Sequence, residues 1–177
     1  MIGPLIGVMK LSPRSAIIKN DTVRCHIDFR GGIRLGEKPP HTLPEIRKSI
    51  VLNAPISKVW EAVATSGGIA AWWMPNTFEP VLGRDFILHT GQFGDSPCKV
   101  TELDLPNKIG FDWDEDWHVV FELKELEYGK TEFTLIHSGW NADKVTKFGQ
   151  PHSIIRDIMD NGWEPLVKEK LVAFIEA

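Results

Sequence analysis

Between residues 84 and 138 the chain consists of short runs of alternating apolar and polar residues, each closed by a turn signal. The runs are RDFILHT, CKVTELDL, KIGFDWD, HVVFELKELE and TEFTLIHS, and GQFGDSP, PN, EDW and YGK separate them. Side chains on a strand alternate between its two faces, and turns this close together join neighbouring antiparallel strands. The sequence therefore predicts an antiparallel meander of five or six strands.

The alternation gives this meander one apolar face and one polar face. The apolar face is shared by three sets of residues: Ile109, Phe111 and Trp113; Trp117, Val119, Phe121 and Leu123; and Phe133, Leu135 and His137. Charged and hydroxyl side chains fall on the opposite face, which we expect to meet water. These are Glu122, Lys124, Glu132 and Thr134. A curved sheet of this kind needs another element to cover its apolar face.

Two short helices are predicted after an earlier strand. IRKSIVLN, residues 46–53, is an alternating β-branched run, and APISKVWEAVAT follows it. One face of the second run has the i, i+3, i+4, i+7 spacing of a helix: Ile56, Val59, Trp60 and Val63. We expect Asn53 or Ala54 to cap this helix, with Pro55 in its first turn. Residues 65–68, TSGG, predict a break before a second helix, IAAWW, which Pro75 ends.

Residues 153–177, SIIRDIMDNGWEPLVKEKLVAFIEA, again carry apolar residues at helical spacing. Gly162 and Pro165 predict a break or kink, so we expect the longer helix to run from about residue 162 to the end. The element order is strand, two short helices, meander and final helix. It predicts an α+β fold in which a curved antiparallel β-sheet wraps around a long C-terminal helix.

Residues 1–44 read differently from the domain predicted for residues 45–177. They contain none of the seven tryptophans and end in the Gly/Pro-rich stretch RGGIRLGEKPPHTLP. SAIIK and VRCHIDF are compatible with a strand or hairpin. We interpret the segment as a flexible N-terminal extension or as a mis-assigned start, with the true start near Leu35 or Leu43.

The distribution of charge and cysteine excludes several functional classes. The chain has 20 Lys and Arg against 24 Asp and Glu, and its excess of acid lies in residues 45–177. Such a domain lacks the basic face that phosphate backbones require, so we expect no nucleic-acid partner. Cys25 and Cys98 form no disulfide or metal-binding pattern. No signal peptide and no run of ~20 apolar residues is present, and we expect a cytoplasmic protein without membrane insertion.

The stretch VLNAPISKVWEAVATSGGIAAWWMP, together with FTLIHSGW and GWEPLVKEKL, resembles the SRPBCC superfamily, also called START-like or helix-grip. Within it, the chain is similar to the group named for homology to the activator of the heat-shock-protein-90 ATPase. The resemblance covers residues 45–177. It implies a deep cavity between the sheet and the C-terminal helix, where relatives bind lipids, sterols, polyketides or other flat apolar molecules, and where some relatives do chemistry.

The resemblance also implies a possible chaperone partner. In the eukaryotic activators, however, a separate N-terminal domain makes a large part of the contact with the chaperone. Here 44 weakly patterned residues occupy that position. Activation by the same mechanism is therefore the alternative reading, and not the first one.

Aromatic residues are numerous enough to line a cavity of ~300–1,000 Å³. Trp72 and Trp73 are adjacent, so their rings cannot both enter one narrow core stripe, and one of them is expected at the cavity or its rim. Filling of the core is the competing reading for every tryptophan, and we prefer it for Trp60. The predicted ligand-binding residues are Trp72, Trp73, Met74, Phe86, Phe111, Trp113, Trp117, Phe121, His137, Trp140 and Trp163.

Few residues suggest catalysis. His137 is an inward-facing polar group, read either as a satisfied core histidine or as a hydrogen-bonding contact to a ligand. The four acids of DWDEDW are interpreted as a solvated hairpin turn. Ser138 points away from its neighbour His137, and no metal, nucleotide or hydrolase motif occurs.

We therefore predict a non-catalytic, stress- or metabolism-related protein that binds a small hydrophobic molecule, aromatic or lipid-like, without a cofactor or metal. One alternative is a chaperone co-factor of the heat-shock-protein-90 ATPase activator type. Another is a cyclase- or hydratase-like enzyme, for which His137 is the acid or base candidate.

Overall fold

The computed structural model describes residues 26–27, 33–34 and 41–177. Two short strands, β1 (His26–Ile27) and β2 (Ile33–Arg34), pair antiparallel with each other. Of the strand or hairpin predicted from SAIIK and VRCHIDF, only β1 falls within the described residues, and Cys25 lies outside them. The extension or mis-assigned start predicted for residues 1–44 also falls largely outside them. The described residues from His41 onward belong to one compact unit.

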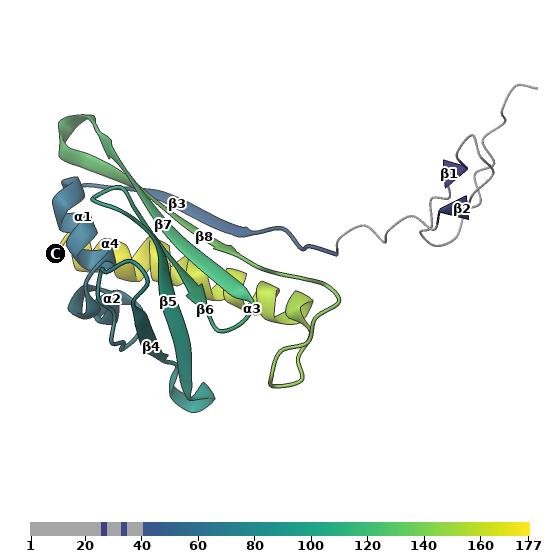
Figure 1. The fold of residues 1–177 in the computed structure, drawn as a ribbon. Helices are drawn as coiled ribbons and strands as arrows, with labels where there is room; N and C mark the ends of the chain where they lie inside the picture. Colours follow the sequence, from purple (N-terminus) through teal and green to yellow (C-terminus); the bar gives the residue numbers. More distant parts are fainter. Residues whose placement is uncertain (1–25, 28–32, 35–40) are drawn as a thin grey trace, which may run out of the picture. The chain divides into compact units, whose positions relative to one another are not determined.

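Six antiparallel strands form a single curved sheet in this unit (Figure 1). They are β3 (Ile46–Leu52), β4 (Asp85–His89), β5 (Asp95–Asp104), β6 (Lys108–Trp113), β7 (Trp117–Leu126) and β8 (Lys130–Ser138). The spatial order is β3-β8-β7-β6-β5-β4, so the first strand of the unit closes the far edge beside the last. The predicted meander is confirmed, although β5 begins three residues before the predicted run at Cys98. Short 3₁₀ turns, Gly91–Phe93 and Glu127–Gly129, follow β4 and β7.

Two short helices, α1 (Ile56–Val63) and α2 (Ser66–Trp72), connect β3 to β4. The predicted break between the two helices is present but shorter than residues 65–68, because α2 already begins at Ser66. The hydroxyl of Thr65 caps this helix by accepting a hydrogen bond from the backbone N–H of Gly68 at 3.0 Å. The predicted cap of α1 is wrong: its N-cap is Pro55, and no side chain bonds to the helix end.

The terminal helix is one continuous element that starts ten residues before the predicted position. It comprises α3 (His152–Pro165), a π-helical segment (Leu166–Leu171) and α4 (Val172–Ile175). Pro165 is accommodated where the α-helix widens into the π turn, so no break occurs. Residues four apart in an α-helix differ by about 40° in direction around the helix axis. The wider π turn offsets this difference. The inward face is therefore made at four-residue spacing by Trp163, Val167, Leu171 and Ile175, all at most 2% exposed.

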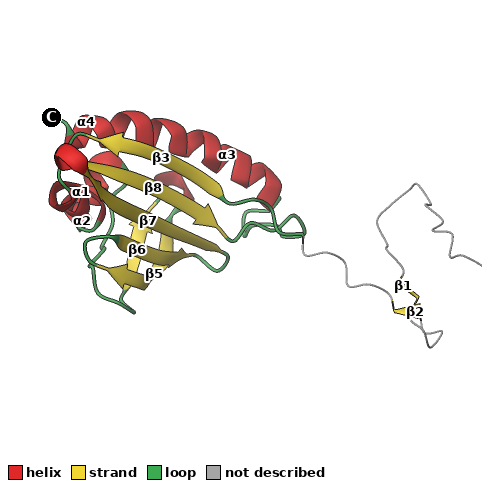
Figure 2. Cartoon of the chain, turned by 90° about the horizontal axis from the view of Figure 1, so that it is seen from above, coloured by secondary structure: helices red, strands yellow, loops and turns green. Residues whose placement is uncertain are grey.

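This helix covers the concave face of the sheet, and α1 and α2 lie near its C-terminal end (Figure 2). Polar contacts fix it along the edge strand β3. The ammonium of Lys48 pairs with Asp160 at 2.7 Å and with Glu164 at 2.8 Å. The backbone N–H of Asn53 donates to the Glu176 carboxylate at 2.9 Å. The predicted α+β architecture, with a curved sheet around a long C-terminal helix, is confirmed.

The inward faces of sheet and helix together form the core. All ten residues assigned to the apolar face of the meander are buried except Trp117, which is half-buried. Ile154 and Ile158 of α3, although apolar, are at least half exposed. Among the residues that the structure describes, no helix is both long and apolar enough to cross a membrane.

Gly68 tests the close approach of α2 to α1. A Cβ at this position would lie 2.2 Å from the carbonyl oxygen of Glu61 and 2.7 Å from that of Ala62. Because these are backbone atoms, we expect Gly68→Ala to lower the free energy of unfolding by about 2–3 kcal/mol. The matched control is Gly67→Ala, whose Cβ meets nothing within 4 Å and which we expect to be neutral or stabilising by ~0.5 kcal/mol. Urea unfolding measures both, and equal effects would contradict the packing.

Candidate functional site

Ten of the eleven predicted ligand-binding residues are rings that form one connected cluster between the sheet and the terminal helix. Neighbouring ring centroids lie 4.5 to 6.4 Å apart. The strands contribute Phe86, Phe111, Trp113, Trp117, Phe121 and His137, α2 and its end contribute Trp72 and Trp73, and Trp140 and Trp163 complete the set. Met74 is half-buried against the same core. Most of these rings belong to buried residues, so the cluster is an apolar interior.

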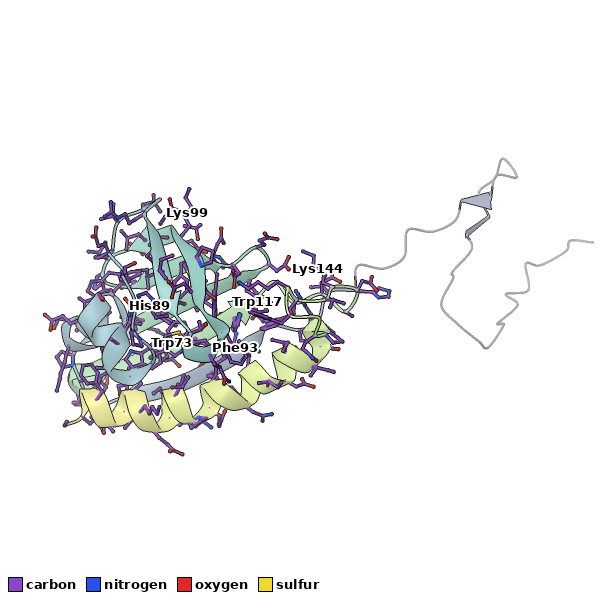
Figure 3. All side chains as sticks on the ribbon, turned by 90° about the horizontal axis from the view of Figure 1, so that it is seen from below. Trp73, His89, Phe93, Lys99, Trp117 and Lys144 are labelled. Carbon is purple, nitrogen blue, oxygen red and sulfur yellow. The ribbon has the colours of Figure 1, made fainter. Side chains whose placement is uncertain are left out.

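The two adjacent tryptophans have different environments. Trp72 is 1% exposed, and its indole N–H donates to the carbonyl of Ala62 at 3.0 Å. Trp73, labelled in Figure 3, is half-buried. Its ring centroid lies 4.7 Å from that of Trp163 and 5.5 Å from that of Trp113. Trp72 is therefore a satisfied core residue, whereas Trp73 connects the sheet, the helix and the partly exposed end of α2.

His137 is fully buried at the centre of the polar part of the cluster. Its Nδ1 accepts a hydrogen bond from the indole N–H of Trp163 at 3.0 Å, which joins the helix to β8. Its carbonyl oxygen accepts one from the indole N–H of Trp140 at 2.9 Å. Gly139, between these two residues, has φ +91°, and a Cβ there would lie 2.0 Å from the Asp116 carbonyl oxygen, so the backbone at this position requires glycine.

Several buried ring nitrogens have no hydrogen-bond partner among the described residues. They are Nε1 of Trp113, Nε1 of Trp117, Nε2 of His137 and both ring nitrogens of His152. Trp113 and Trp117 form a directly opposed pair at the β6–β7 turn, with centroids 5.7 Å apart. An unsatisfied polar group in an apolar interior costs about 1–3 kcal/mol. These nitrogens without a hydrogen-bond partner distinguish this part of the core from the rest.

His152 was not predicted as a site residue. It is fully buried at the first position of α3, its ring lies 5.8 Å from that of Trp117, and its Nε2 is 3.4 Å from a carboxylate oxygen of Asp116. In the sequence His152 follows Pro151 outside any alternating strand, so no pattern indicated that it faces inward. Only the return of the 139–151 loop to the β6–β7 turn brings it there.

The acids of this turn are not simply solvated, as the sequence suggested. Asp114 pairs with Lys147 at 3.0 Å, and Asp116 pairs with Lys144. Both lysines belong to the 139–151 loop, so the two ion pairs hold that loop against the end of the aromatic cluster. The prediction of a solvated turn is wrong for these two residues, because their partners lie about 30 positions away in sequence.

The connection between β4 and β5 contacts the 139–151 loop. Phe93, in the connection between β4 and β5, lies 6.0 Å from Phe148, and the two side chains are 59% and 58% exposed. The ammonium of Lys147 lies 5.5 Å from the Phe148 ring, within cation–π range. One end of the domain thus carries an exposed aromatic contact between two loops.

Two hollows of the described surface lie elsewhere. One, of about 320 Å³, is on the outer polar face of the sheet near Lys108, Glu122 and Glu132. The other, of about 300 Å³, lies between α1 and α4 near Lys58 and Phe174. Neither is lined by any of the eleven predicted residues, whose rings pack against each other instead. Binding within the cluster would require some of these rings to move.

The titration behaviour of the site limits its chemistry. Burial lowers the pKa of His137 to about 3, so the imidazole is neutral at physiological pH and a poor general acid or base. Burial also raises the pKa of the Cys98 thiol to about 12, which keeps it in the unreactive protonated form. Among the described residues, no group of three His, Cys, Asp or Glu side chains is arranged to hold a metal ion.

A curved antiparallel sheet closed over a long C-terminal helix, with an aromatic interior, defines a helix-grip protein of the SRPBCC superfamily. Residues 53–176 match the family described as Activator of Hsp90 ATPase homolog 1-like protein. The chain belongs to this family. No curated protein matches the chain.

Solved structures agree with this assignment. Protein BH1534 of Bacillus halodurans is 44% identical, with a TM-score of 0.69, and the match covers 76% of this chain and 99% of that one. An Hsp90 activator from Plasmodium falciparum is 18% identical, with a TM-score of 0.58 over 75% and 93% of the two chains. The Aha1 dimer of Colwellia psychrerythraea is 20% identical, with a TM-score of 0.56 over 71% and 91%. The last two show likeness of fold alone.

The depressed pKa of His137 predicts a specific pH dependence of stability. Between about pH 6.5 and pH 3 the unfolded chain binds a proton at this residue and the native protein does not. The contribution of His137 to the free energy of unfolding is therefore constant above pH 6.5. It decreases as the pH falls, by about 2 kcal/mol at pH 5. We expect His137→Gln, which retains an acceptor for Trp163 but does not titrate, to lose this component. Urea unfolding at pH 7 and pH 5 measures it, and parallel curves for the two proteins would contradict it.

Proposed function

We propose that this protein binds a small, flat, hydrophobic molecule between the sheet and the C-terminal helix. The observation that carries the proposal is the group of buried ring nitrogens on Trp113, Trp117 and His137, inside an aromatic cluster, that have no hydrogen-bond partner among the described residues. Buried polar groups of native proteins are nearly always hydrogen-bonded to protein, water or ligand. A polar substituent on an aromatic ligand would supply the missing partner.

The surrounding rings supply the affinity. Flat ligands stack favourably on tryptophan, and burial of ~200–300 Å² of ligand apolar surface at ~25 cal/mol/Å² contributes about 5–8 kcal/mol before the costs of association. We therefore expect micromolar binding. The molecule is bound without being transformed, because His137, the acid or base candidate for a cyclase or hydratase, is neutral and uses Nδ1 to hold Trp163.

Entry of a ligand requires the cluster to open. The half-buried Trp73, at the C-terminal end of α2, is the ring best placed to move, and the exposed Phe93–Phe148 contact lies between two surface loops. Both are less constrained than the fully buried Trp72, Trp140 and Trp163. We assign the ligand's route to the end of the domain that these loops form.

The alternative is a chaperone co-factor, and it is supported by the match of residues 53–176 to the Hsp90 ATPase activator family. An ATPase assay of the chaperone with and without the full chain decides this alternative. A raised ATPase rate would support it, and an unchanged rate at saturating protein would dismiss it.

We also propose a cytoplasmic location, since Cys98 is a free thiol, as is usual in a reducing compartment.

The paired tryptophans provide the test of ligand binding. Titration of intrinsic tryptophan fluorescence with flat aromatic compounds, fatty acids and sterols should show saturable quenching by at least one class. We expect Trp73→Ala to weaken that binding by about tenfold, because a stacking surface is lost. Trp72→Phe should mainly lower stability, by about 1–3 kcal/mol, since it removes the hydrogen bond to Ala62. Trp60→Phe, on α1, is the control for lost fluorescence.

Two results would contradict the proposal. One is the absence of saturable quenching by any of the three ligand classes. The other is an equal loss of affinity in Trp73→Ala and in the Trp60→Phe control, which would place the ligand outside the aromatic cluster.

A further inference from the structure

The hydrogen bond between Trp163 and His137 fixes the position of the proton on His137. An indole nitrogen is a donor only, so the Nδ1 that receives it at 3.0 Å must carry a free lone pair. The low pKa of His137 keeps the imidazole neutral. Its single ring proton is therefore on Nε2, the nitrogen that has no partner among the described residues.

Two further donors lie beside this one. Nε1 of Trp113 and Nε1 of Trp117 are buried, without partners among the described residues, and, like every indole nitrogen, able only to donate. The three rings form a triangle, with centroid distances of 5.5 Å for Trp113–His137, 5.7 Å for Trp113–Trp117 and 5.9 Å for Trp117–His137. We call these three residues the donor triangle. All of its unpaired groups are N–H donors.

The acceptors next to Trp113, Trp117 and His137 in the chain make other contacts. Asp112 makes a hydrogen bond with the His118 ring. Asp114 accepts hydrogen bonds from Ser96 and Lys147. Asp116 pairs with Lys144, and the His137 carbonyl receives Trp140. None of these acceptors receives a hydrogen bond from the triangle, and an acceptor on another molecule would satisfy its N–H groups.

The charge of that acceptor is also constrained. His137 is neutral, and the nearby lysines of the 139–151 loop, Lys144 and Lys147, are paired with Asp116 and Asp114. A carboxylate ligand would be buried without a cationic partner, which is strongly unfavourable. A neutral carbonyl oxygen, with two lone pairs, can accept from two N–H groups without this penalty.

We propose that the ligand of this site is a flat aromatic ketone whose carbonyl oxygen accepts hydrogen bonds from two of the N–H groups of the donor triangle of Trp113, Trp117 and His137. This rests on the proposed function and specifies the chemical class of its ligand. The aromatic body of the ketone lies against the remaining rings of the cluster. The triangle selects ketones over hydrocarbons of the same shape and over aromatic carboxylates.

The test uses three tricyclic probes with the same flat skeleton: 9-fluorenone, fluorene and fluorene-9-carboxylate. We expect fluorenone to bind about tenfold more tightly than fluorene, since it satisfies buried donors that fluorene leaves unpaired. The carboxylate should bind more weakly than fluorenone at pH 7. Fluorescence or calorimetric titration of the full chain gives the three dissociation constants.

Variants assign the preference to the donor triangle. Trp113→Phe and Trp117→Phe keep an aromatic ring and lose the N–H, so each should reduce the fluorenone-to-fluorene ratio to about threefold or less. Trp60→Phe, outside the cluster, should leave the ratio unchanged. In ¹⁵N-labelled protein, fluorenone should shift the indole N–H resonances of Trp113 and Trp117, and a long-range ¹H–¹⁵N spectrum should show His137 protonated on Nε2.

The outcomes separate the two proposals. If fluorenone and fluorene bind equally, or if the variants leave their ratio unchanged, the donor triangle does not select the ligand, although the site still binds flat molecules. His137 protonated on Nδ1 would also overturn the inference. If none of the three probes binds while fatty acids or sterols quench saturably, the ketone is excluded and the binding site stands. If no compound of any class binds, both proposals fail.

Discussion

The hydrogen bond from the indole of Trp163 to the imidazole of His137 is the interaction on which the interior of this domain depends. It joins the terminal helix to the strand β8 through two side chains that are almost fully buried. Each of these buried polar groups would be unsatisfied alone, and each provides the hydrogen-bond partner of the other. Because it consumes Nδ1 of His137, the same bond leaves the opposite nitrogen of the ring as a donor without a partner among the described residues.

The aromatic interior is therefore uneven in its polarity. Trp72 and Trp140 donate to backbone carbonyls and need no further partner. Trp113 and Trp117, at the β6–β7 turn, have no such acceptor among the described residues. The unsatisfied nitrogens thus gather at the end of the domain where the 139–151 loop is held by ion pairs to Asp114 and Asp116. A ligand with one polar end and one flat apolar body matches this asymmetry.

Much of the fold could be predicted from the sequence, since strand alternation has a period of two and depends on few neighbours. This pattern correctly placed Phe111, Phe121 and Phe133 on the buried face of the sheet. The terminal helix was harder, because Gly162 and Pro165 are local signals for a break. The structure overrides them with a π turn and the packing of residues four apart.

The site was predictable in its residue types but not in its connections. Nothing near Trp72 in sequence indicates that the carbonyl of Ala62 accepts a hydrogen bond from its indole N–H, and nothing near Asp116 indicates Lys144 or His152. These partners lie on other elements, the neighbouring helix for Trp72 and the 139–151 loop and helix α3 for Asp116, and meet only in the folded domain. The difference between a filled core and a ligand site depends on such long-range partners.

Intermolecular NOEs between unlabelled fluorenone and the ¹³C,¹⁵N-labelled protein test the central claim most directly. The account predicts NOEs to the rings of Trp113, Trp117 and Trp163, between the sheet and the helix. NOEs confined to the outer face of the sheet, near Lys108 and Thr134, would place the ligand elsewhere and contradict it.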